Sequence, residues 1–132
     1  MPQQDKFKRE MDRVGAMLAK LLGMLLHKEL HNPEEMEKFV QQFRTEMDID
    51  PDAFVAMNEV DSLRFLVQEK KFSVEHLRTF GNILYDMAQK VGYSGKRDVL
   101  LKKALSIYEY VSANSGGTLY LDVLYKINEL KQ

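Results

Sequence analysis

Apolar residues recur along this chain at intervals of three and four, the spacing of helices that bury one face. The first such run extends from about Asp5 to Leu30 and places six apolar residues on one side, namely Phe7, Met11, Val14, Leu18, Leu21 and Leu25. No alternation of apolar and polar residues is long enough to predict a β-strand. The pattern predicts an all-α fold of antiparallel helices, because the connections between the runs are short.

Polar residues followed by proline mark where the next helices begin. Asn32-Pro33 and Asp50-Pro51 each combine an N-cap residue with a proline in the first turn. We expect a helix after Asn32, a short helix after Asp50, and a further turn or two over residues 61–68. The first of these helices would bury one apolar side, made of Met36, Phe39, Val40, Phe43 and Met47.

The C-terminal half predicts three more helices. Ser73 is the expected N-cap of a long helix that ends near Gly92. A second long helix should run from about Lys96 to Ala113 and stop at Gly116-Gly117. A final helix from about Thr118 would present Leu121, Leu124, Ile127 and Leu130 on its apolar face. We expect one domain over residues 1–132, with an N-terminal helical segment (1–70) followed by a helix pair and a capping helix (71–132).

The two long C-terminal helices carry small residues where we expect them to cross. Leu77, Phe80, Gly81 and Leu84 lie on the first helix, and Ala104, Tyr108 and Val111 lie on the second. A glycine or alanine at the crossing removes the side-chain bulk that would keep the two backbones apart. We therefore predict close packing at Gly81 and Ala104.

Composition narrows the function classes. The 132 residues are 45% hydrophobic and 30% charged, with a net charge of −1, so no overall positive field would recruit nucleic acid. The absence of cysteine excludes disulfides and thiolate chemistry and is compatible with a cytoplasmic location. The apolar stretch 14–26 contains Lys20 and is shorter than the ~20 residues of a membrane-spanning helix. We expect no stable membrane insertion.

Two motifs carry a family resemblance. Leu77-x-x-Phe80-Gly81-x-x-Leu84, followed by Ala104-x-x-x-Tyr108, resembles a tetratricopeptide-like helix hairpin with elongated helices. With the opening Lys6-Phe7-Lys8-Arg9 and Leu18-Ala19-Lys20-Leu21-Leu22, the whole chain is similar to a family of small uncharacterised bacterial proteins. The resemblance implies an N-terminal helical segment before one tetratricopeptide-like pair and a capping helix. It also implies a bacterial cytoplasmic setting, and it brings no known activity.

The same resemblance implies a binding face. In the tetratricopeptide fold the first helix of a pair lines a concave surface, which places Arg78, Asn82, Tyr85 and Asp86 toward a bound protein or peptide. A guanidinium and an amide four residues apart match the carboxylate at a peptide terminus. The alternative is an ordinary polar helix face, because a single repeat supplies only half of such a clamp.

Small residues form a second pattern, at every fourth position of the first helix: Gly15, Ala19 and Gly23. Together with the neighbouring apolar side they give this helix a wider face than one core needs. Two explanations remain open. The helix is either packed on both sides within its own domain, or its extra face meets a second copy in a homodimer.

A metal site is the second hypothesis. His27 and His31 are four residues apart, so two imidazoles would lie on one helical face. A zinc-protease motif would need glutamate after the first histidine, where this chain has Lys28. The alternative is a pair of solvated histidines near a helix C-terminus.

The sequence does not show a set of residues that would form a catalytic site together. We find no nucleophile beside a base, no paired carboxylates and no phosphate-binding glycine loop. The basic pairs, Lys102-Lys103 among them, are expected on the solvated surface. We therefore expect a non-enzymatic helical interaction or scaffold protein without a cofactor, and a metal-binding protein that uses His27 and His31 with nearby carboxylates as the alternative.

Overall fold

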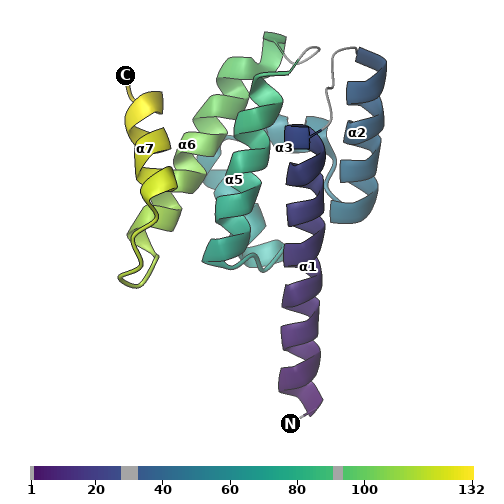
Figure 1. Ribbon diagram of the computed structural model, residues 1–132, viewed down its shortest axis with the longest axis vertical. Coiled ribbons are helices and arrows are strands. Elements are labelled where there is room, and N and C mark those ends of the chain that lie inside the picture. The colour runs from purple at the N-terminus through teal and green to yellow at the C-terminus, as the bar shows by residue number, and fades with distance from the viewer. Residues whose placement is uncertain (1, 28–32, 91–93) are drawn as a thin grey trace.

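The computed structural model describes residues 2–27, 33–90 and 94–132, and in these ranges it contains helices and no strand (Figure 1). The helices are α1 (Pro2–His27), α2 (Pro33–Met47), α3 (Pro51–Ala56), α4 (Glu59–Arg64), α5 (Val74–Ala88), α6 (Arg97–Ala113) and α7 (Leu121–Leu130). A π-helical turn, η1 (Phe65–Glu69), continues α4, and a 3-10 turn, η2 (Ser94–Lys96), precedes α6. The predicted all-α fold is confirmed.

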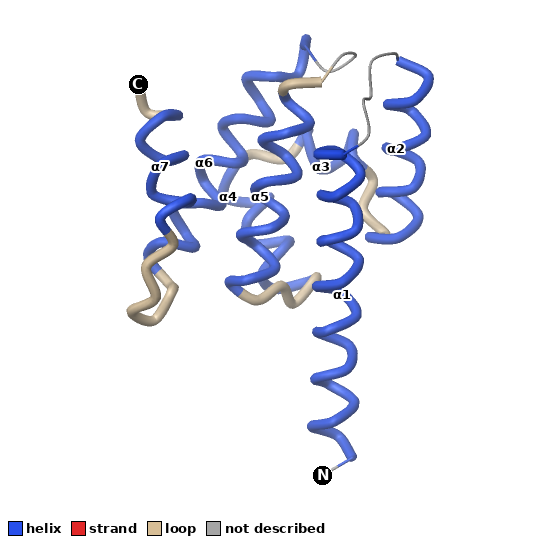
Figure 2. The backbone as a smooth tube through the Cα atoms, in the orientation of Figure 1, coloured by secondary structure: helices blue, strands red, loops and turns tan. Residues whose placement is uncertain are grey.

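Helix α5 occupies the centre of the molecule. It packs along α6 on one side and along α1 on the other, while α7 lies outside α6 (Figures 1 and 2). Helix α2 stands beside α1 at the opposite edge, and α3 and α4 lie behind α5 in this view. The N-terminal part of α1 extends beyond the rest of the body, at the bottom of Figure 1.

Two of the predicted helix starts are confirmed in detail. The Asp50 carboxylate accepts a hydrogen bond from the Asp52 backbone N–H at 3.1 Å and caps α3. The Ser73 hydroxyl oxygen accepts from the His76 backbone N–H at 3.1 Å, and His76 Nδ1 accepts from the Ser73 N–H at 3.2 Å. This reciprocal box satisfies two donors at the start of α5, and such caps stabilise a helix by about 1 kcal/mol.

Phe80 joins the N-terminal segment to the C-terminal helices. Its ring, fully buried on α5, lies 5.9 Å from the Phe43 ring of α2, 5.5 Å from the Phe54 ring of α3 and 5.7 Å from the Phe72 ring, centroid to centroid. Tilted and edge-on aromatic pairs at these distances add to the gain from burial. One aromatic cluster therefore holds α2, α3 and the entry to α5 together.

The neighbouring Gly81 faces α6. A Cβ atom at this position would lie 2.9 Å from Tyr108 Cε1, closer than real Cβ contacts come. Tyr108 and Ala104 are both fully buried on α6. The predicted close packing of the two long helices is confirmed, with Gly81 making room for the Tyr108 ring.

The first helix differs from its predicted environment at its N-terminal end. It begins at Pro2, three residues before the predicted start, while its predicted end near Leu30 lies outside the described residues. Phe7 was expected on the buried face, yet 62% of its surface is exposed. The N-terminal part of α1 projects beyond the rest of the body (Figure 1), so this end of the helix has little core to cover it.

The predicted apolar face of α7 is wrong at its first two positions. Leu121 is 70% exposed and Leu124 is 38% exposed, whereas Val123 is buried. Helix α7 is rotated so that Val123 faces the core, with Ile127 partly buried against it. The burial of Val123 and the polar contacts between α7 and α5 together set this rotation, and the apolar spacing alone does not reveal those polar contacts.

Lys103 is a second correction, because the sequence placed it on the solvated surface and the structure buries it. The side chain is 1% exposed, and Nζ donates to the Met57 carbonyl and, at 2.6 Å, to the Ser62 hydroxyl. Met57 ends α3, so the ammonium group lies where the helix leaves a carbonyl unpaired. Burial lowers the pKa of Lys103, and the nearby Glu59 opposes that shift.

Two glycine substitutions should change stability in opposite directions. We expect Gly81→Ala to lower the free energy of unfolding by at least about 1 kcal/mol, because the crowding against Tyr108 outweighs the better helix propensity of alanine. Gly15→Ala is the matched control, since its Cβ would lie 3.5 Å from His76 Nε2, an ordinary contact. It should raise stability by about 0.5–1 kcal/mol. Urea denaturation measures both, and changes of the same sign would contradict the proposed crossing.

Candidate functional site

The four residues predicted to bind a partner lie together on α5, and α7 covers this face. Arg78 donates through Nε and a terminal nitrogen to both carboxylate oxygens of Asp122, at 3.1 and 3.0 Å. Its guanidinium also lies 4.6 Å from the centre of the Tyr120 ring. A bidentate arginine–carboxylate pair fixes orientation as well as distance. Arg78 is therefore engaged by the protein's own C-terminal helix.

Two further hydrogen bonds join α5 and α7 further along both helices. Lys126 Nζ donates to Asn82 Oδ1 at 2.8 Å, and the Tyr85 hydroxyl donates to Glu129 Oε1 at 2.6 Å. Partners in all three pairs are 44 positions apart in the chain. A constant separation means that α5 and α7 run parallel and in register, as Figure 1 shows. We call this set of pairs the α5–α7 ladder.

Lys126 occupies an aromatic environment at the centre of the ladder. Its Nζ lies 4.9 Å from the centre of the Tyr85 ring and 5.8 Å from that of Tyr108. Asn82 Oδ1 accepts from Lys126 and also from the Tyr108 hydroxyl at 2.7 Å. Burial raises the pKa of Tyr108 far above its ordinary value, so its hydroxyl stays a donor. This cluster ties α5, α6 and α7 together.

Asp86, the fourth predicted residue, is half-buried beside this cluster. Loss of hydration raises the pKa of its carboxyl group, and the positive charges of Lys126 and Lys90 work against that shift. All four predicted side chains therefore do share one face of α5. In this structure the face holds the protein's own helix, and binding of a separate partner there stays a prediction.

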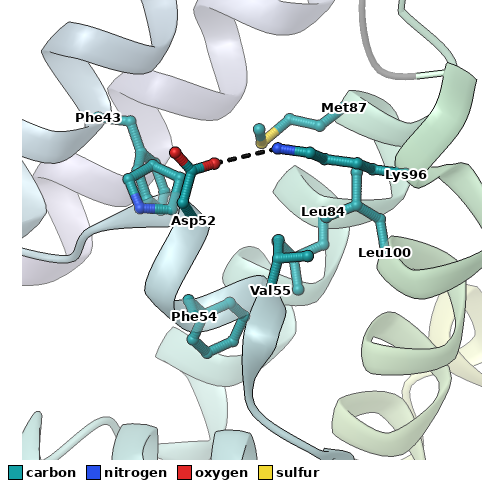
Figure 3. Close-up of a pocket in the computed structure, with 9 residues that line it drawn as sticks. Phe43, Asp52, Phe54, Val55, Leu84, Met87, Lys96 and Leu100 are labelled. Carbon is teal, nitrogen blue, oxygen red and sulfur yellow. Dashed lines mark hydrogen bonds and ion pairs between the residues drawn. The ribbon is translucent and has the colours of Figure 1, made fainter.

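A small cavity lies between α2, α3, α5 and α6 (Figure 3). Its walls include Phe43, Phe54, Leu84 and Met87, and its volume is about 10 Å³. Across it Lys96 Nζ donates to Asp52 Oδ1 at 3.0 Å, and this contact lowers the pKa of Asp52. A volume of this size holds about one water molecule. The cavity is a packing feature and not a ligand site.

The buried Ser62–Lys103 pair, which the sequence analysis missed, has the chemistry of a nucleophile beside an amine. Ser62 is 2% exposed, and its hydroxyl donates to the Asn58 carbonyl at 2.8 Å while accepting from Lys103. The serine proton is therefore directed at a backbone oxygen and away from the lysine. Together with its contact to Met57, the pair serves to satisfy backbone groups where α3 ends and α4 begins.

The small residues of α1 have different environments. His76 Nδ1 accepts a hydrogen bond, so Nε2 carries the proton and donates to the Met11 carbonyl at 2.9 Å. Gly15 lies beside this imidazole, 3.5 Å from it when a Cβ is built. Ala19 is exposed and Gly23 is half-buried. The contact at Gly15 is within the chain, as the first of the two explanations for the small-residue pattern of α1 requires.

His31 and the side chain of His27 lie outside the described residues. The part of the chain that the structure describes contains no group of three or more histidine, aspartate, glutamate or cysteine residues arranged to hold a metal ion. Metal binding by His27 and His31 therefore stays a prediction.

The outer side of α7 exposes an apolar surface that the sequence analysis did not anticipate. Leu119 is 67% exposed, Leu121 70%, Leu124 38% and Tyr125 70%. Leu119 lies just before α7 and the other three lie on it, and we call the four residues the α7 stripe. The sequence analysis places Leu121 and Leu124 on the buried face of the last helix and assigns Tyr125 to neither face. Leu121, Leu124 and Tyr125 are three or four positions apart, so they lie on one side of the helix.

The Tyr85 contact predicts a specific alkaline sensitivity. The hydrogen bond to Glu129 raises the pKa of Tyr85 from 10.0 to about 12. Its stabilising effect is therefore complete below pH 10 and is lost as the pH rises from 10 to 12, because the unfolded chain ionises first. We expect the free energy of unfolding to fall more steeply over this range in the wild type than in Tyr85→Phe.

Urea titrations at several pH values measure this difference. Tyr125→Phe is the control, because Tyr125 lies on the exposed side of α7, and its curve should follow that of the wild type. Equal slopes for Tyr85→Phe and the wild type would show that the Glu129 contact does not form in solution.

Comparisons place these features in context. No protein-family model, curated protein or solved structure matches the chain. No helix among residues 2–27, 33–90 and 94–132 is both long and apolar enough to cross a lipid bilayer. The function must therefore be inferred from the α5–α7 ladder and the α7 stripe themselves.

Proposed function

We propose that this protein is a non-enzymatic helical interaction protein that binds a protein partner through the α7 stripe. The observation that carries the proposal is the exposure of Leu121, Leu124 and Tyr125 on one side of α7, whose other side is anchored, together with that of Leu119 just before the helix. A docking helix from a partner would cover them with its own apolar face, in the manner of helix-in-groove recognition.

The α5–α7 ladder supports this function by holding the stripe in place. Helix α7 has ten residues, and a free helix of that length is marginal in water. The contacts of Asp122, Lys126 and Glu129 fix its rotation about its own axis. A fixed surface binds with a smaller loss of conformational entropy than a mobile one. In this proposal Arg78, Asn82 and Tyr85 act through α7 and do not touch the partner.

The arrangement of the C-terminal helices also favours an interaction role. Helices α5 and α6 pack closely at Gly81, and α7 runs parallel to α5, as the tetratricopeptide resemblance implies for successive first helices. Helix pairs of that kind stack and bind other proteins. We propose that the pair is tetratricopeptide-like and that the protein works in a bacterial cytoplasm.

A photo-crosslinking amino acid in place of Tyr125 tests the proposed surface in the native cell. We expect a discrete protein adduct at this position and none when the same amino acid replaces Lys38, which is exposed on α2. Adding Leu121→Glu should reduce the Tyr125 adduct at least about tenfold, because a charge would have to be buried at the interface.

The outcomes are distinct. Absence of an adduct at position 125, equal adducts at 125 and 38, or insensitivity to Leu121→Glu would each reject the proposed surface. The melting temperature of the Leu121→Glu variant should match that of the wild type, because the side chain is 70% exposed.

A further inference from the structure

We propose that His76 is a proton-sensitive switch at the start of α5, which holds this end of the helix at neutral pH and releases it in mild acid. The two ring nitrogens have partners of opposite kind, and the residue is only 8% exposed. His76 would act in this way whatever partner the α7 stripe binds.

The partners of the ring suit only its neutral form. The Ser73 backbone N–H donates to Nδ1 at 3.2 Å, and Nε2 donates to the Met11 carbonyl of α1 at 2.9 Å. A backbone N–H can only donate and a carbonyl oxygen can only accept, so the site requires one acceptor and one donor from the ring. A neutral imidazole supplies both. An imidazolium supplies two donors, and one of its N–H groups would point at the Ser73 N–H.

The packing around the ring offers no side-chain oxygen or nitrogen in exchange. Phe72 lies edge-on to the imidazole, with 5.7 Å between the ring centres. On the side of α1 the neighbour is Gly15, which has no side chain. A ring that rotates to relieve the contact with Ser73 would also turn Nε2 away from the Met11 carbonyl. The protonated ring therefore has to give up at least one of its two contacts.

Charged groups near the ring do not neutralise an imidazolium in this geometry. No ion pair of His76 occurs among the residues that the structure describes. Lys70 donates to backbone carbonyls at the end of α2, and Glu75 and Arg78 contact residues at the start of α7. The others are exposed to solvent. The full set is Lys8 and Asp12 on α1, Lys70 and Lys71 before α5, and Glu75 and Arg78 on α5.

The first turn of α5 is the part that acid would release. Without its acceptor on His76, the Ser73 N–H loses the partner that the capping box gives it. The same turn and the next carry Glu75 and Arg78, which bind Tyr120 and Asp122 at the start of α7. Protonation of one imidazole would therefore loosen the place where α1, α5 and α7 are joined.

The pH range follows from the chemistry of histidine, which ordinarily gains its proton between about pH 7 and pH 5. The unfolded chain takes up this proton freely, whereas the folded site must break a hydrogen bond to do so. Stability that depends on the neutral ring is therefore complete above this range and is lost as the pH falls through it.

NMR of the full-length wild type from about pH 7.5 to pH 5 tests the switch at its own atoms. We expect the Ser73 amide signal to shift with the same midpoint as the His76 ring signals, because the ring nitrogen that accepts from this amide becomes protonated. A Ser73 signal that stays in place while the ring titrates, or a ring that takes up no proton above pH 5, would overturn the proposal.

Urea denaturation at about pH 7.5 and pH 5.5 measures the consequence for folding. The folding equilibrium constant of the wild type should fall about fivefold more than that of His76→Gln, which is the effect of losing one helix cap. Glutamine is the matched control, because it is a usual residue at this position of a capping box and does not titrate.

A second control addresses the remaining histidines. The double variant His27→Gln/His31→Gln removes both of them and should keep the wild-type response to acid. Equal responses of the wild type and His76→Gln, or loss of the response in the double variant, would contradict the assignment to His76. The NMR titration needs no substitution, so it decides the proposal even if His76→Gln does not fold.

Discussion

The close approach of α5 and α6 at Gly81 is the constraint on which the rest of the structure depends. Three consecutive residues of α5 point in three directions from this place. Phe80 enters the aromatic cluster of the N-terminal segment, Gly81 admits the Tyr108 ring, and Asn82 accepts both the Tyr108 hydroxyl and Lys126 of α7. A larger residue at position 81 would displace Tyr108, and with it the group that orients Asn82 toward α7.

This geometry explains why α7 exposes one apolar side. Its polar residues meet α5 and its buried residues meet α6, so both contacts together set the rotation of the helix. Leu121, Leu124 and Tyr125 then have to face solvent. The exposed stripe follows from the ladder, and it is not an accident of a loosely attached terminus. That connection links the residues first suspected of binding a partner to the surface now proposed for it.

Local signals in the sequence predicted the local structure well. The caps at Asp50 and Ser73, the crossing at Gly81 and the all-α class depend on neighbouring residues or on regular spacing, and all four are confirmed. The environments of Leu121 and Lys103 depend on distant residues. Helix α7 has apolar residues on two sides, and only its partners decide which side is buried. Lys103 looks solvated in the sequence because its acceptors are distant: the Met57 carbonyl at the end of α3 is 46 positions away and the Ser62 hydroxyl of α4 is 41 positions away.

The candidate site shows the same difference between local contacts, which the sequence predicts, and long-range contacts, which it does not. The sequence grouped Arg78, Asn82, Tyr85 and Asp86 correctly on one helical face, because their spacing is local. It could not identify the occupant of that face, since the matching residues of α7 lie 44 positions later. The contact of His76 with α1 was missed because it joins residues 65 positions apart. Its capping contact with Ser73 is local, but a capping box usually has glutamate or glutamine at this position.

A charge exchange between α5 and α7 tests the register on which this account rests. Arg78→Asp and Asp122→Arg should each lower the free energy of unfolding, because each places two like charges where the bidentate pair now forms. If the helices are parallel and in register, the double variant should lose less stability than the two single variants together, by about 1 kcal/mol or more. This difference is moderate because both side chains are partly exposed to solvent. Losses that simply add would show that the two residues do not meet, and the ladder, the rotation of α7 and the exposed stripe would then have no basis.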